Sequence, residues 1–486
     1  MFDIISNAMI DDVVAEAMQL DMCFLSGPGQ ARQVPFTLTP TPISVESFKT
    51  LVDVGALLGR LTQALAANAA LLEEIHAPLA ESEPFFAELL SIHRELSTPA
   101  GSLPRIPLLL QRSDFMLDRT LGPSLVECNS IAAGMAPFGD RIQQLHLYIQ
   151  QRWPEDFARY SAATGATIVP NPATSRLAEA ITLAANHVRR EAKDGDTATF
   201  LMIVQEDEDN IFDQRLLERA LQRRGVKTCR RTMRQLHKRL STGPNLRLML
   251  EDVGPIDVVY LRAGYQYQDY VAADLDALRC CDALRAVRVF IERHRVAVNA
   301  TVSQQLATSK RMQQYIASNP ASLLHALGFT PAEAAALKAI FVEMRLVDES
   351  TANRLQESGT SQWVMKNQGE GGGHCLFDGA IIERLATLDK KAYPGWTLMR
   401  RLQPTGREVA TLRVREGKAQ RVERLVSEIG IFTAHLDGEP LGGSAQDPGY
   451  VGYLVRSKPA DVTEGGIHSG FGMLDSLLMT ASDSEV

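Results

Sequence analysis

The sequence predicts a mixed α/β protein, in which a parallel-sheet subdomain lies between a helix-rich first part and antiparallel strands near the end. From residue 196 to residue 265, apolar strands alternate with helices over short loops, which is the pattern of a parallel sheet. From residue 397 to residue 435, three strands alternate with turns, which is the pattern of an antiparallel meander. The 486 residues are enough for two or three domains with a large core.

Helices are expected to dominate the first hundred residues. The spacing of apolar residues predicts helices over 8–24, 44–75 and 84–96. Along the longest of these, apolar residues from Leu51 to Ile75 follow one another at steps of three and four. This stripe predicts a core face or a contact between subunits, and it indicates no chemistry.

Two short strands come next, and each leads into polar residues. One covers 106–112 and ends at Arg112, and the other covers 124–126 and leads into Glu127 and Asn129. Polar residues at strand ends are typical of the lining of a cleft. Glu127 and Asn129 are two positions apart, so in an extended segment their oxygen donors project to one side and could share a hard cation. The alternative is a turn in which Asn129 caps the next helix, and these two residues alone favour that turn.

The parallel-sheet subdomain is expected to present polar loops. Its strands are predicted at 199–204, 226–229, 246–250 and 256–261, with a helix over 213–224. The loops carry a mixed polar set that suits a small zwitterion, namely Asp209, Asn210, Gln214, Arg262 and Tyr265. The acidic run within this set has an alternative interpretation, as a solvated loop or as charge at a helix N-terminus.

The stretch Trp363–Cys375, W-V-M-K-N-Q-G-E-G-G-G-H-C, is the most informative in the chain. Its four glycines leave backbone N–H groups uncovered, and successive N–H groups that point one way bind phosphate. Lys366 adds a positive charge, and Glu370 places a carboxylate inside this phosphate cradle. Because like charges repel, that carboxylate suggests Mg²⁺, which takes one or two carboxylates together with phosphate oxygens. The stretch is interpreted as a nucleotide-phosphate loop with a metal ligand, and a flexible surface hairpin is the alternative.

Further charged groups lie on either side of this stretch. Lys310 belongs to a predicted helix around 303–316, and Arg456 and Lys458 precede a second glycine-rich loop. Glu428 lies in the apolar strand S-E-I-G-I-F, where a buried acid needs a metal, an amine or a hydroxyl as its partner. Lysines can neutralise phosphate, and arginines can clamp carboxylates.

Composition narrows the class of protein. Lys and Arg number 50 against 58 Asp and Glu, so the net charge of 50 − 58 = −8 argues against general binding of nucleic acid or anionic membranes. None of the six cysteines forms a CxxC pair, which fits a reducing compartment. The acidic N-terminus does not resemble a secretory signal, and no apolar run approaches the roughly 20 residues that cross a bilayer. The expected class is a cytoplasmic enzyme.

Common nucleotide and hydrolase motifs are absent from the sequence. It contains no P-loop signature, no G-x-S-x-G elbow and no match to the dinucleotide fingerprint. What remains is a set of acids and cations suited to Mg²⁺, phosphate and a substrate carboxylate. Together these groups indicate a carboxylate-activating ligase, in which ATP phosphorylates an acid and an amine then displaces the phosphate.

The order and span of the motifs resemble eukaryotic-type glutathione synthetase, a circularly permuted member of the ATP-grasp superfamily. The similarity runs from V-P-F-T-L-T-P near residue 35 to the final G-G-I-H-S-G-F-G loop. The motifs between them are Q-R-S-D-F-M (111–116), V-E-C-N-S-I-A-A-G (126–134), D-N-I-F-D-Q-R (209–215), R-A-G-Y (262–265), Q-L-A-T-S-K-R-M-Q-Q (305–314), V-M-K-N-Q-G-E-G-G-G (364–373), S-E-I-G-I-F (427–432) and V-R-S-K (455–458).

The resemblance implies ATP-dependent ligation of γ-glutamylcysteine to glycine, giving glutathione, ADP and phosphate. It implies two Mg²⁺ held by the residues that match Glu127, Asn129 and Glu370, and catalytic roles for Arg112, Glu370, Arg456 and Lys458. The residues that match ATP-binding positions are Glu127, Lys310, Lys366, Gly369, Glu370, Gly371, Gly372, Gly373, Phe377, Met399, Leu402, Glu428, Lys458 and Glu464. The residues that match substrate-binding positions are Arg112, Ile131, Ala132, Ala133, Gly134, Glu208, Asp209, Asn210, Gln214, Arg262, Ala263, Gly264, Tyr265, Arg456, Ile467 and His468.

The resemblance also implies a division of the chain and a homodimer. The expected parts are an N-terminal helical and main-domain segment (1–195), an α/β substrate-binding subdomain (196–300), a helical connector (301–339), a mobile ATP-grasp lid (340–425) and main-domain strands with the last glycine-rich loop (426–486). The expected partners are the small-molecule substrates, with no nucleic acid and no membrane.

The chain departs from the family pattern at several positions. Lys-Pro-Gln-Arg-Glu before the three glycines becomes Lys-Asn-Gln-Gly-Glu, the following Asn-Asn becomes His374-Cys375, and the adenine-side Tyr becomes Phe377. The Glu of the usual Met-Glu-Lys hinge is Arg400, and Val-Ala-Ala before the last glycine becomes Ile467-His468-Ser469. Two alternatives therefore stay open beside glutathione synthesis, namely a ligase that uses β-alanine or serine and a regulator that binds nucleotide without catalysis. A ligase with a different acid substrate is a third.

Overall fold

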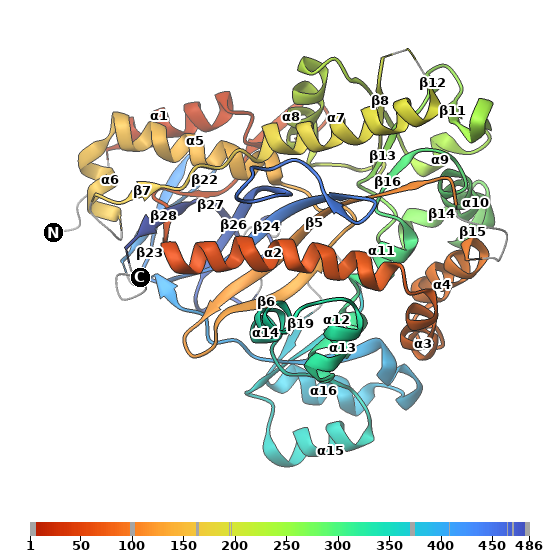
Figure 1. The fold of residues 1–486 in the computed structure, drawn as a ribbon. Coiled ribbons are helices and arrows are strands. Elements are labelled where there is room, and N and C mark those ends of the chain that lie inside the picture. Colours follow the sequence, from red (N-terminus) through yellow and green to blue (C-terminus); the bar gives the residue numbers. More distant parts are fainter. Residues whose placement is uncertain are drawn as a thin grey trace.

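The computed structural model describes residues 6–97, 103–161, 165–193, 195, 197–369, 375–407, 409–463, 465–468 and 471–481. Figure 1 shows one large sheet in the middle of the molecule, helices on both of its faces, and a smaller helix-and-sheet unit at the bottom of the view. The fold is mixed α/β, as the sequence predicts.

The helix-rich first part is confirmed, with two differences. The helix predicted over 8–24 ends at Gln19, because a strand begins at Cys23, and the helix predicted over 44–75 is divided. Its elements are α1 (Asn7–Gln19), β1 (Cys23–Gly27), β2 (Gln30–Gln33), β3 (Phe36–Thr37), β4 (Thr41–Ser44), α2 (Val45–Ala66), α3 (Ala69–Ala80) and α4 (Pro84–Leu96). The helix predicted over 44–75 is two helices, α2 and α3. They are separated because the side chain of Asn68 accepts a hydrogen bond from the backbone N–H of Leu71 at 3.1 Å and so begins a new helix.

The next elements carry most of the predicted site residues. They are β5 (Ile106–Asp118), β6 (Gly122–Asn129), α5 (Ala136–Arg152), α6 (Pro154–Tyr160), β7 (Thr167–Ile168), α7 (Ala173–Ala192), β8 (Thr199–Ile203), α8 (Ile211–Arg223), β9 (Lys227–Arg231), α9 (Met233–Leu236), β10 (Leu240–Thr242), η1 (Pro244–Leu246), β11 (Leu248–Leu250), β12 (Gly254–Pro255), β13 (Val258–Leu261), η2 (Tyr267–Tyr270), β14 (Val271–Ala272), β15 (Asp276–Cys280), α10 (Asp282–Glu292) and β16 (Ala297–Asn299). The strand predicted to end at Arg112 continues to Asp118, because it pairs with β6 over its second half.

The remaining elements form the smaller unit and the last strands. They are α11 (Val302–Ala307), α12 (Lys310–Ser318), α13 (Ala321–Ala326), α14 (Pro331–Ile340), β17 (Met344–Leu346), α15 (Glu349–Ser358), β18 (Trp363–Asn367), β19 (Cys375–Phe377), α16 (Gly379–Thr387), η3 (Lys390–Gly395), β20 (Trp396–Arg400), β21 (Gly406–Arg407), β22 (Thr411–Arg415), β23 (Lys418–Val422), β24 (Leu425–Leu436), β25 (Glu439–Pro440), β26 (Tyr450–Pro459), β27 (Met473–Asp475) and β28 (Leu477–Thr480).

The large sheet joins the predicted parallel and antiparallel parts. Its strands lie in the order β23-β22-β3-β27-β26-β24-β5-β16-β13-β8-β9. From β5 through β16, β13 and β8 to β9 the neighbours are parallel, which confirms the parallel sheet predicted for the middle of the chain. Strand β24 pairs antiparallel with β5 on one side and with β26 on the other. Strand β5 therefore joins the parallel part of the sheet to the antiparallel part.

Two predicted strand assignments are wrong. Residues 248–250 do not join the parallel sheet, because β11 pairs antiparallel with β10 and β12 in a separate sheet. The meander predicted from 397 to 435 is not continuous either. Strand β20 belongs to a small sheet in the order β17-β20-β18-β19, whereas β22 and β24 belong to the large sheet.

Helices cover the two faces of the large sheet. Helix α2 packs against β24 and β5 on one face, and α5 and α7 pack against β26 on the other (Figure 1). Glycines let α2 approach closely, since a Cβ at Gly55 would lie 2.9 Å from Ile431 Cγ2 and a Cβ at Gly59 would overlap the His435 ring. The apolar stripe predicted on this helix is therefore a core face.

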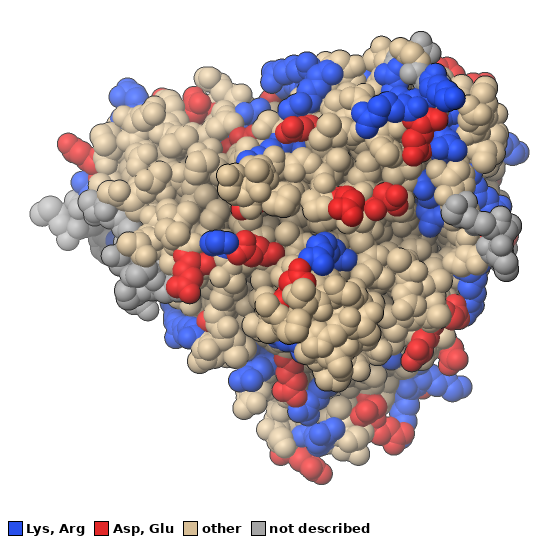
Figure 2. All heavy atoms as spheres, viewed as in Figure 1, with Lys and Arg blue, Asp and Glu red and all other residues tan. Residues whose placement is uncertain are grey.

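Lys and Arg side chains alternate with Asp and Glu over the face drawn in Figure 2. Among the residues that the structure describes, no helix is long and apolar enough to cross a bilayer.

Candidate functional site

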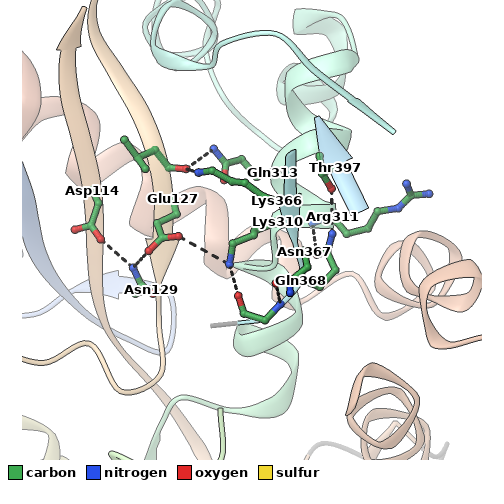
Figure 3. Close-up of polar contacts among 12 residues, drawn as sticks. Asp114, Glu127, Asn129, Lys310, Arg311, Gln313, Lys366, Asn367, Gln368 and Thr397 are labelled. Carbon is green, nitrogen blue, oxygen red and sulfur yellow. Dashed lines mark hydrogen bonds and ion pairs between the residues drawn. The ribbon is translucent and has the colours of Figure 1, made fainter. Parts of the chain in front are cut away.

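Antiparallel pairing of β5 with β6 gathers the first group of predicted residues. Asp114 lies opposite Glu127, and Arg112 lies opposite Asn129. The amide nitrogen of Asn129 donates to Asp114 Oδ2 at 3.0 Å and to Glu127 Oε1 at 3.2 Å (Figure 3). The two side chains therefore lie on one side of the strand, as their spacing predicts. Because the amide nitrogen is used in these bonds, the carbonyl oxygen of Asn129 is the group left to face a cation.

Lysines from two other segments surround Glu127. Lys310 Nζ lies 3.9 Å from Glu127 Oε2 and donates to the carbonyl oxygen of Gly369 at 2.9 Å. Lys366 Nζ donates to the carbonyl oxygen of Val126 at 3.3 Å. Burial disfavours the charged form of Glu127, but the cations Lys310 and Lys366 outweigh it and lower the pKa of Glu127 to about 2. The carboxylate is therefore anionic at neutral pH and suited to a hard cation.

Asp114 is a buried carboxylate at the centre of the site, and it is not among the predicted site residues. Arg112 donates to it twice, from Nε to Oδ1 at 2.6 Å and from Nη2 to Oδ2 at 2.8 Å. Arg456 Nη2 donates to Asp114 Oδ2 at 3.2 Å. The sequence did carry a signal, because Asp114 is two positions from Arg112 in a strand and therefore shares its face.

Strands β24 and β26 bring Arg456 to this carboxylate. Arg456 lies opposite Glu428, and their side chains form an ion pair. Burial would lower the pKa of Arg456, but Glu428 and Asp114 outweigh it and raise the pKa, so the guanidinium keeps its charge. The buried acid predicted to need a partner has an arginine as that partner. Lys458, two positions further along β26, donates to the carbonyl oxygen of Thr463 at 2.5 Å.

One face of the small sheet turns predicted nucleotide residues toward Glu127. Val364 pairs with Phe377 and with Met399, and paired residues project to the same face. Lys366 shares that face because it is two positions from Val364. The opposite face, with Met365 and Leu398, packs under α15 and α16. Met399 and Leu402 belong to a small apolar cluster with Val342 and Met344.

Gln368 fixes the entrance to the glycine loop. Its Oε1 accepts from the backbone N–H of Arg311 at 3.0 Å, and its Nε2 donates to Thr397 Oγ1 at 3.0 Å (Figure 3). The backbone N–H of Gly369 donates to Asn367 Oδ1 at 2.9 Å. The predicted residues Glu370, Gly371, Gly372, Gly373 and Glu464 lie outside the described residues.

A second group of predicted residues gathers at the ends of the parallel strands. The N–H of Ala132 donates to the carbonyl oxygen of Leu261 at 3.0 Å, which ties segment 131–134 to the end of β13. Gly134 lies against Arg262 so closely that a Cβ there would overlap the guanidinium. Glu208 accepts from the N–H of Asn210 at 3.1 Å and from Gln214 Nε2 at 2.5 Å.

Three buried polar atoms of this group have no hydrogen-bond partner in the described part of the chain. They are Asn210 Oδ1, Gln214 Oε1 and Arg262 Nε. Gln214, Arg262 and Gly134 line a pocket with an empty volume of about 220 Å³. Buried polar groups are normally hydrogen-bonded, so this arrangement fits a polar ligand that supplies both donors and acceptors.

Asp213 lies in the wall of this pocket and is a further residue that the motifs do not predict for the site. Its carboxylate accepts from the N–H of Met135 at 3.0 Å and from that of Phe138 at 3.3 Å, at the start of α5. Burial raises the pKa of Asp213, although Arg262 opposes this. It lies inside the motif D-N-I-F-D-Q-R, where the sequence analysis assigned only Asp209, Asn210 and Gln214.

The other predicted substrate residues lie beside these two groups. Tyr265 Oη accepts from Gln205 Nε2 at 3.1 Å, the carbonyl oxygen of Gly264 accepts from Gln305 Nε2 at 3.1 Å, and Ala263 is buried. Ile131, Tyr265 and Gln305 line a pocket next to Asn129 with an empty volume of about 380 Å³. Asp209 and His468 pair with each other at 3.1 Å between Oδ2 and Nδ1.

The donor set fits Mg²⁺ in part. A carboxylate and an amide carbonyl are ligands that Mg²⁺ accepts, and phosphate oxygens and waters complete its shell. Within the described ranges, no group of three or more His, Cys, Asp or Glu side chains is placed to hold a metal by itself. The predicted third ligand, Glu370, is outside those ranges.

Comparisons with known proteins agree with this chemistry. A family model described as eukaryotic glutathione synthase, ATP binding domain, matches residues 9–479. The glutathione synthetase of Homo sapiens is 29% identical over 451 residues, covering 91% of this chain and 89% of that protein. The chloroplastic glutathione synthetase of Solanum lycopersicum is 27% identical, covering 92% of this chain and 77% of that protein. The apo structure of a glutathione synthetase like-effector from Globodera pallida has a TM-score of 0.73 at 17% identity, covering 97% of this chain and 96% of that one.

The family model and the relatives identify an ATP-dependent carbon–nitrogen ligase, which confirms the predicted enzyme class. The family model matches nearly the whole chain. The relatives are glutathione synthetases, and the match covers most of the length of each one. This chain belongs to the eukaryotic glutathione synthase family. The predicted resemblance is confirmed, and the Globodera structure supports the mixed α/β fold.

Proposed function

We propose that this protein ligates γ-glutamylcysteine to glycine with ATP, through an acyl phosphate, and releases glutathione, ADP and phosphate. Asp114 carries this proposal. Its carboxylate connects Asn129, on the side of the lysines, to Arg112 and Arg456, on the side of the peptide pocket. A phosphoryl donor and a carboxylate acceptor would meet at such a junction, where positioning and charge neutralisation drive phosphoryl transfer.

The nucleotide would lie between the small sheet and β6. Lys310 and Lys366 reach the same stretch of β6 from different segments and would bind phosphates, together with the backbone from Gly369 to Gly373. Met399 and Leu402 would flank adenine, since they offer an apolar surface on the face that Lys366 shares. Phe377 pairs with Val364 and so lies on the same face. The ATP site would be completed by Glu428, Lys458 and Glu464.

Mg²⁺ would be held by Glu127, Asn129 and Glu370, with two ions in each active site. Bound there, Mg²⁺ would neutralise the charge of the triphosphate. The low pKa of Glu127 supports this assignment, because the carboxylate is deprotonated at any physiological pH. The amide of Asn129 is oriented by its bonds to Asp114 and Glu127, which leaves Oδ1 available.

The dipeptide would lie across the ends of β13 and β8. The polar atoms of Asn210, Gln214 and Arg262 that find no partner among the described residues suit the amino and carboxylate groups of its γ-glutamyl part. Arg112 and Arg456 would hold the reacting cysteinyl carboxylate and then the oxyanion of the tetrahedral intermediate. The pocket beside Asn129 is the proposed position of the cysteinyl side chain.

The division of the chain and the assembly follow from the family. We propose the permuted ATP-grasp arrangement, with 1–195 as N-terminal and main-domain segment, 196–300 for the substrate and 301–339 as connector. Residues 340–425 would form a lid that excludes water from the acyl phosphate, and 426–486 would complete the main domain. A homodimer in the cytoplasm is proposed as well.

Glu127→Gln tests the reaction and the metal site together. The substitution keeps the shape of the side chain and removes its charge. ADP formation should fall at least a hundredfold, because the carboxylate proposed to bind Mg²⁺ at the triphosphate is lost. Glu349→Gln is the matched control, since Glu349 is exposed and pairs only with Lys390 among the residues described. ADP release that requires γ-glutamylcysteine in the wild type supports the proposal. Wild-type turnover in Glu127→Gln, or turnover without the dipeptide, contradicts it.

The acceptor amine is the least constrained part of the proposal. His468 stands where family members commonly have a small residue, so β-alanine and serine are the competing acceptors. Purified protein supplied with γ-glutamylcysteine and each amine in turn, with product mass as the readout, decides among them. A nucleotide-binding regulator without catalysis is the second candidate, motivated by the changes at 369, 374–375 and 400. Release of phosphate that depends on γ-glutamylcysteine would eliminate it.

A further inference from the structure

We propose that Gln205 and Asp269 are positioning residues that fix the Tyr265 hydroxyl as a hydrogen-bond donor to the dipeptide. The acceptor would be a carbonyl or carboxylate oxygen of γ-glutamylcysteine. The identity of this ligand rests on the proposed function, whereas the bonds that fix the hydroxyl lie within the chain. Gln205 and Asp269 are not among the predicted site residues, and neither needs to touch the substrate.

One carboxylate oxygen of Asp269 orders the turn that follows β13. Its Oδ2 accepts from three successive backbone N–H groups, those of Gly264 at 2.7 Å, Tyr265 at 3.1 Å and Gln266 at 3.4 Å. Successive N–H groups that point one way form a binding site for an anion. In this turn the anion is the chain's own Asp269. A carboxylate of the dipeptide therefore finds these N–H groups occupied.

The two backbone N–H groups before this turn are used as well. Those of Arg262 and Ala263 both donate to the carbonyl oxygen of Ile203, at 2.7 Å and 3.1 Å. Every backbone N–H from residue 262 to residue 266 thus has an acceptor within the chain. If residues 262–265 donate hydrogen bonds to a ligand, the donors are the side chains of Arg262 and Tyr265.

Gln205, which follows β8, sets the direction of the Tyr265 hydroxyl. Its Nε2 donates to Asp269 Oδ1 at 2.8 Å and to Tyr265 Oη at 3.1 Å. A carboxylate accepts and does not donate, so Gln205 has to turn its amide nitrogen, and not its oxygen, toward Asp269. Because the same nitrogen donates to Tyr265 Oη, the hydroxyl hydrogen of Tyr265 points away from Gln205. Burial and the charge of Asp269 raise the pKa of Tyr265, so the phenol keeps this hydrogen at neutral pH.

Tyr265 lies at a pocket, where its hydrogen can meet a ligand. Tyr265 and Ile131 line the pocket next to Asn129, whereas Arg262 and Gly134 line the smaller pocket. Residues 131–134 and 262–265 therefore contribute to both pockets. A dipeptide that extends from one pocket to the other would pass Tyr265.

Gln305 supplies a complementary group to the pocket next to Asn129. It is 8% exposed, and its Nε2 donates to the carbonyl oxygen of Gly264 at 3.1 Å. Its Oε1 is buried and has no hydrogen-bond partner in the described part of the chain. A buried polar atom without a partner is unusual and indicates a ligand or a water that donates to it. The pocket thus has a donor in Tyr265 and an acceptor in Gln305, which suits the carbonyl and N–H groups of a peptide.

Tyr265→Phe tests the donor in the full-length protein. The substitution removes the hydroxyl and keeps the ring. We expect the dissociation constant of γ-glutamylcysteine, measured by calorimetry, to rise about three- to tenfold, which is the contribution of one hydrogen bond. KM for ATP should stay within about twofold of the wild type, since the hydroxyl is proposed to contact the dipeptide alone.

Asp269→Asn tests the positioning, because it reverses the direction of the bonds without removing the side chain. One amide oxygen remains for the three backbone N–H groups, and an NH₂ group replaces the oxygen that faces Gln205. Gln205 must then turn its oxygen toward that NH₂ group and toward Tyr265 Oη, so Tyr265 donates to Gln205 and is lost to the dipeptide. Affinity for γ-glutamylcysteine should fall by the same factor as in Tyr265→Phe, with little change in melting temperature. The double variant should bind no more weakly than Tyr265→Phe alone.

Asp274→Asn is the matched control in the same part of the chain. Asp274 is exposed and pairs with Arg234, so its charge can be removed without a change to the turn. The affinity for γ-glutamylcysteine should be that of the wild type in this variant. Wild-type affinity in Tyr265→Phe overturns the donor, and wild-type affinity in Asp269→Asn overturns the positioning.

Neutron diffraction on crystals of the free wild-type protein tests the direction of the hydroxyl even if the proposed function fails. The deuterium atoms of the Gln205 amide should lie toward Asp269 and Tyr265, and the Tyr265 deuterium should point away from Gln205. A Tyr265 deuterium directed at Gln205 refutes the fixed donor. A wild-type protein that neither binds γ-glutamylcysteine nor makes glutathione refutes the proposed function, and the fixed donor then stands or falls on the neutron result.

Discussion

Asp114 shows how one buried side chain organises the site. It binds Arg112, Asn129 and Arg456, and its exposed fraction is 0%. Without Asp114, Arg456 would keep Glu428 and Asn129 would keep Glu127, but Arg112 would lose the carboxylate with which it pairs. A buried charge that lacks a partner is costly. Asp114 therefore sets the distance between the proposed metal ligands and the proposed carboxylate clamp, although it need touch neither substrate.

Asp114→Asn should reduce kcat/KM at least a hundredfold. Without the charge of Asp114, the positive charges of Arg112 and Arg456 are no longer balanced. Breaking a buried ion pair lowers the free energy of unfolding by about 3 kcal/mol or more. Steady-state kinetics and a thermal melt measure activity and folding separately. Asp53→Asn is the control, because Asp53 is exposed and pairs with Lys49 within α2. Activity within twofold of the wild type would show that the Asp114 carboxylate is dispensable.

Glu127 should also leave a signature in stability against pH. Its pKa in the folded protein is about 2, below the ordinary value of 4.5, so ionised Glu127 stabilises the folded state above about pH 4.5. That contribution is lost as the pH falls from 4.5 toward 2. The difference in free energy of unfolding between the wild type and Glu127→Gln should therefore shrink over this window.

Urea unfolding at pH 6, 5, 4 and 3 measures that difference. Glu349→Gln, at an exposed position, should show no such trend. A difference that stays constant or grows toward low pH would contradict the lowered pKa.

At the scale of elements, the approach of α2 to the sheet depends on two glycines four positions apart. Gly55 faces Ile431 and Gly59 faces His435, so at these two positions the helix backbone lies directly on side chains of β24. His435 is fully buried, and burial lowers its pKa to about 4. The ring is therefore neutral and acts as a packing surface for the helix.

Gly59→Ala should destabilise the protein by about 1–3 kcal/mol, the usual cost of overpacking a core. The clash with His435 outweighs the gain in helix propensity, which is at most about 1 kcal/mol. Gly379→Ala in α16 is the control, because a Cβ there meets nothing within 4 Å. Denaturant unfolding measures both variants. Equal stability of Gly59→Ala and the wild type would show that the helix and the ring can move apart.

Element types could be predicted from the sequence more fully than element partners. The parallel strands were found because their apolar runs alternate with helices, and the same-side placement of Glu127 and Asn129 follows from their spacing alone. The apolar periodicity does not predict the break at Asn68, because it continues across that residue. Strand β20 was placed in a meander because its neighbours in sequence are strands, whereas its hydrogen bonds go to β17 and β18.

At the scale of the whole molecule, the site is built from segments far apart in sequence. Strand β5 joins the parallel part to the antiparallel part, and the small sheet brings Lys366 to β6. The sequence identified residue types and motif order, and the resemblance supplied their roles. It could not show that Asp114 connects them or that His468 binds Asp209, because such contacts depend on tertiary structure.

We propose above all that Glu127 and Asn129 bind a metal-bound triphosphate beside the dipeptide acid. A crystal structure with Mg²⁺, a non-hydrolysable ATP analogue and γ-glutamylcysteine measures this directly. We predict a Mg²⁺ at about 2.1 Å from a Glu127 carboxylate oxygen and from Asn129 Oδ1, with the cysteinyl carboxylate next to the γ-phosphate. A triphosphate bound elsewhere, or a metal that touches neither side chain, would contradict it.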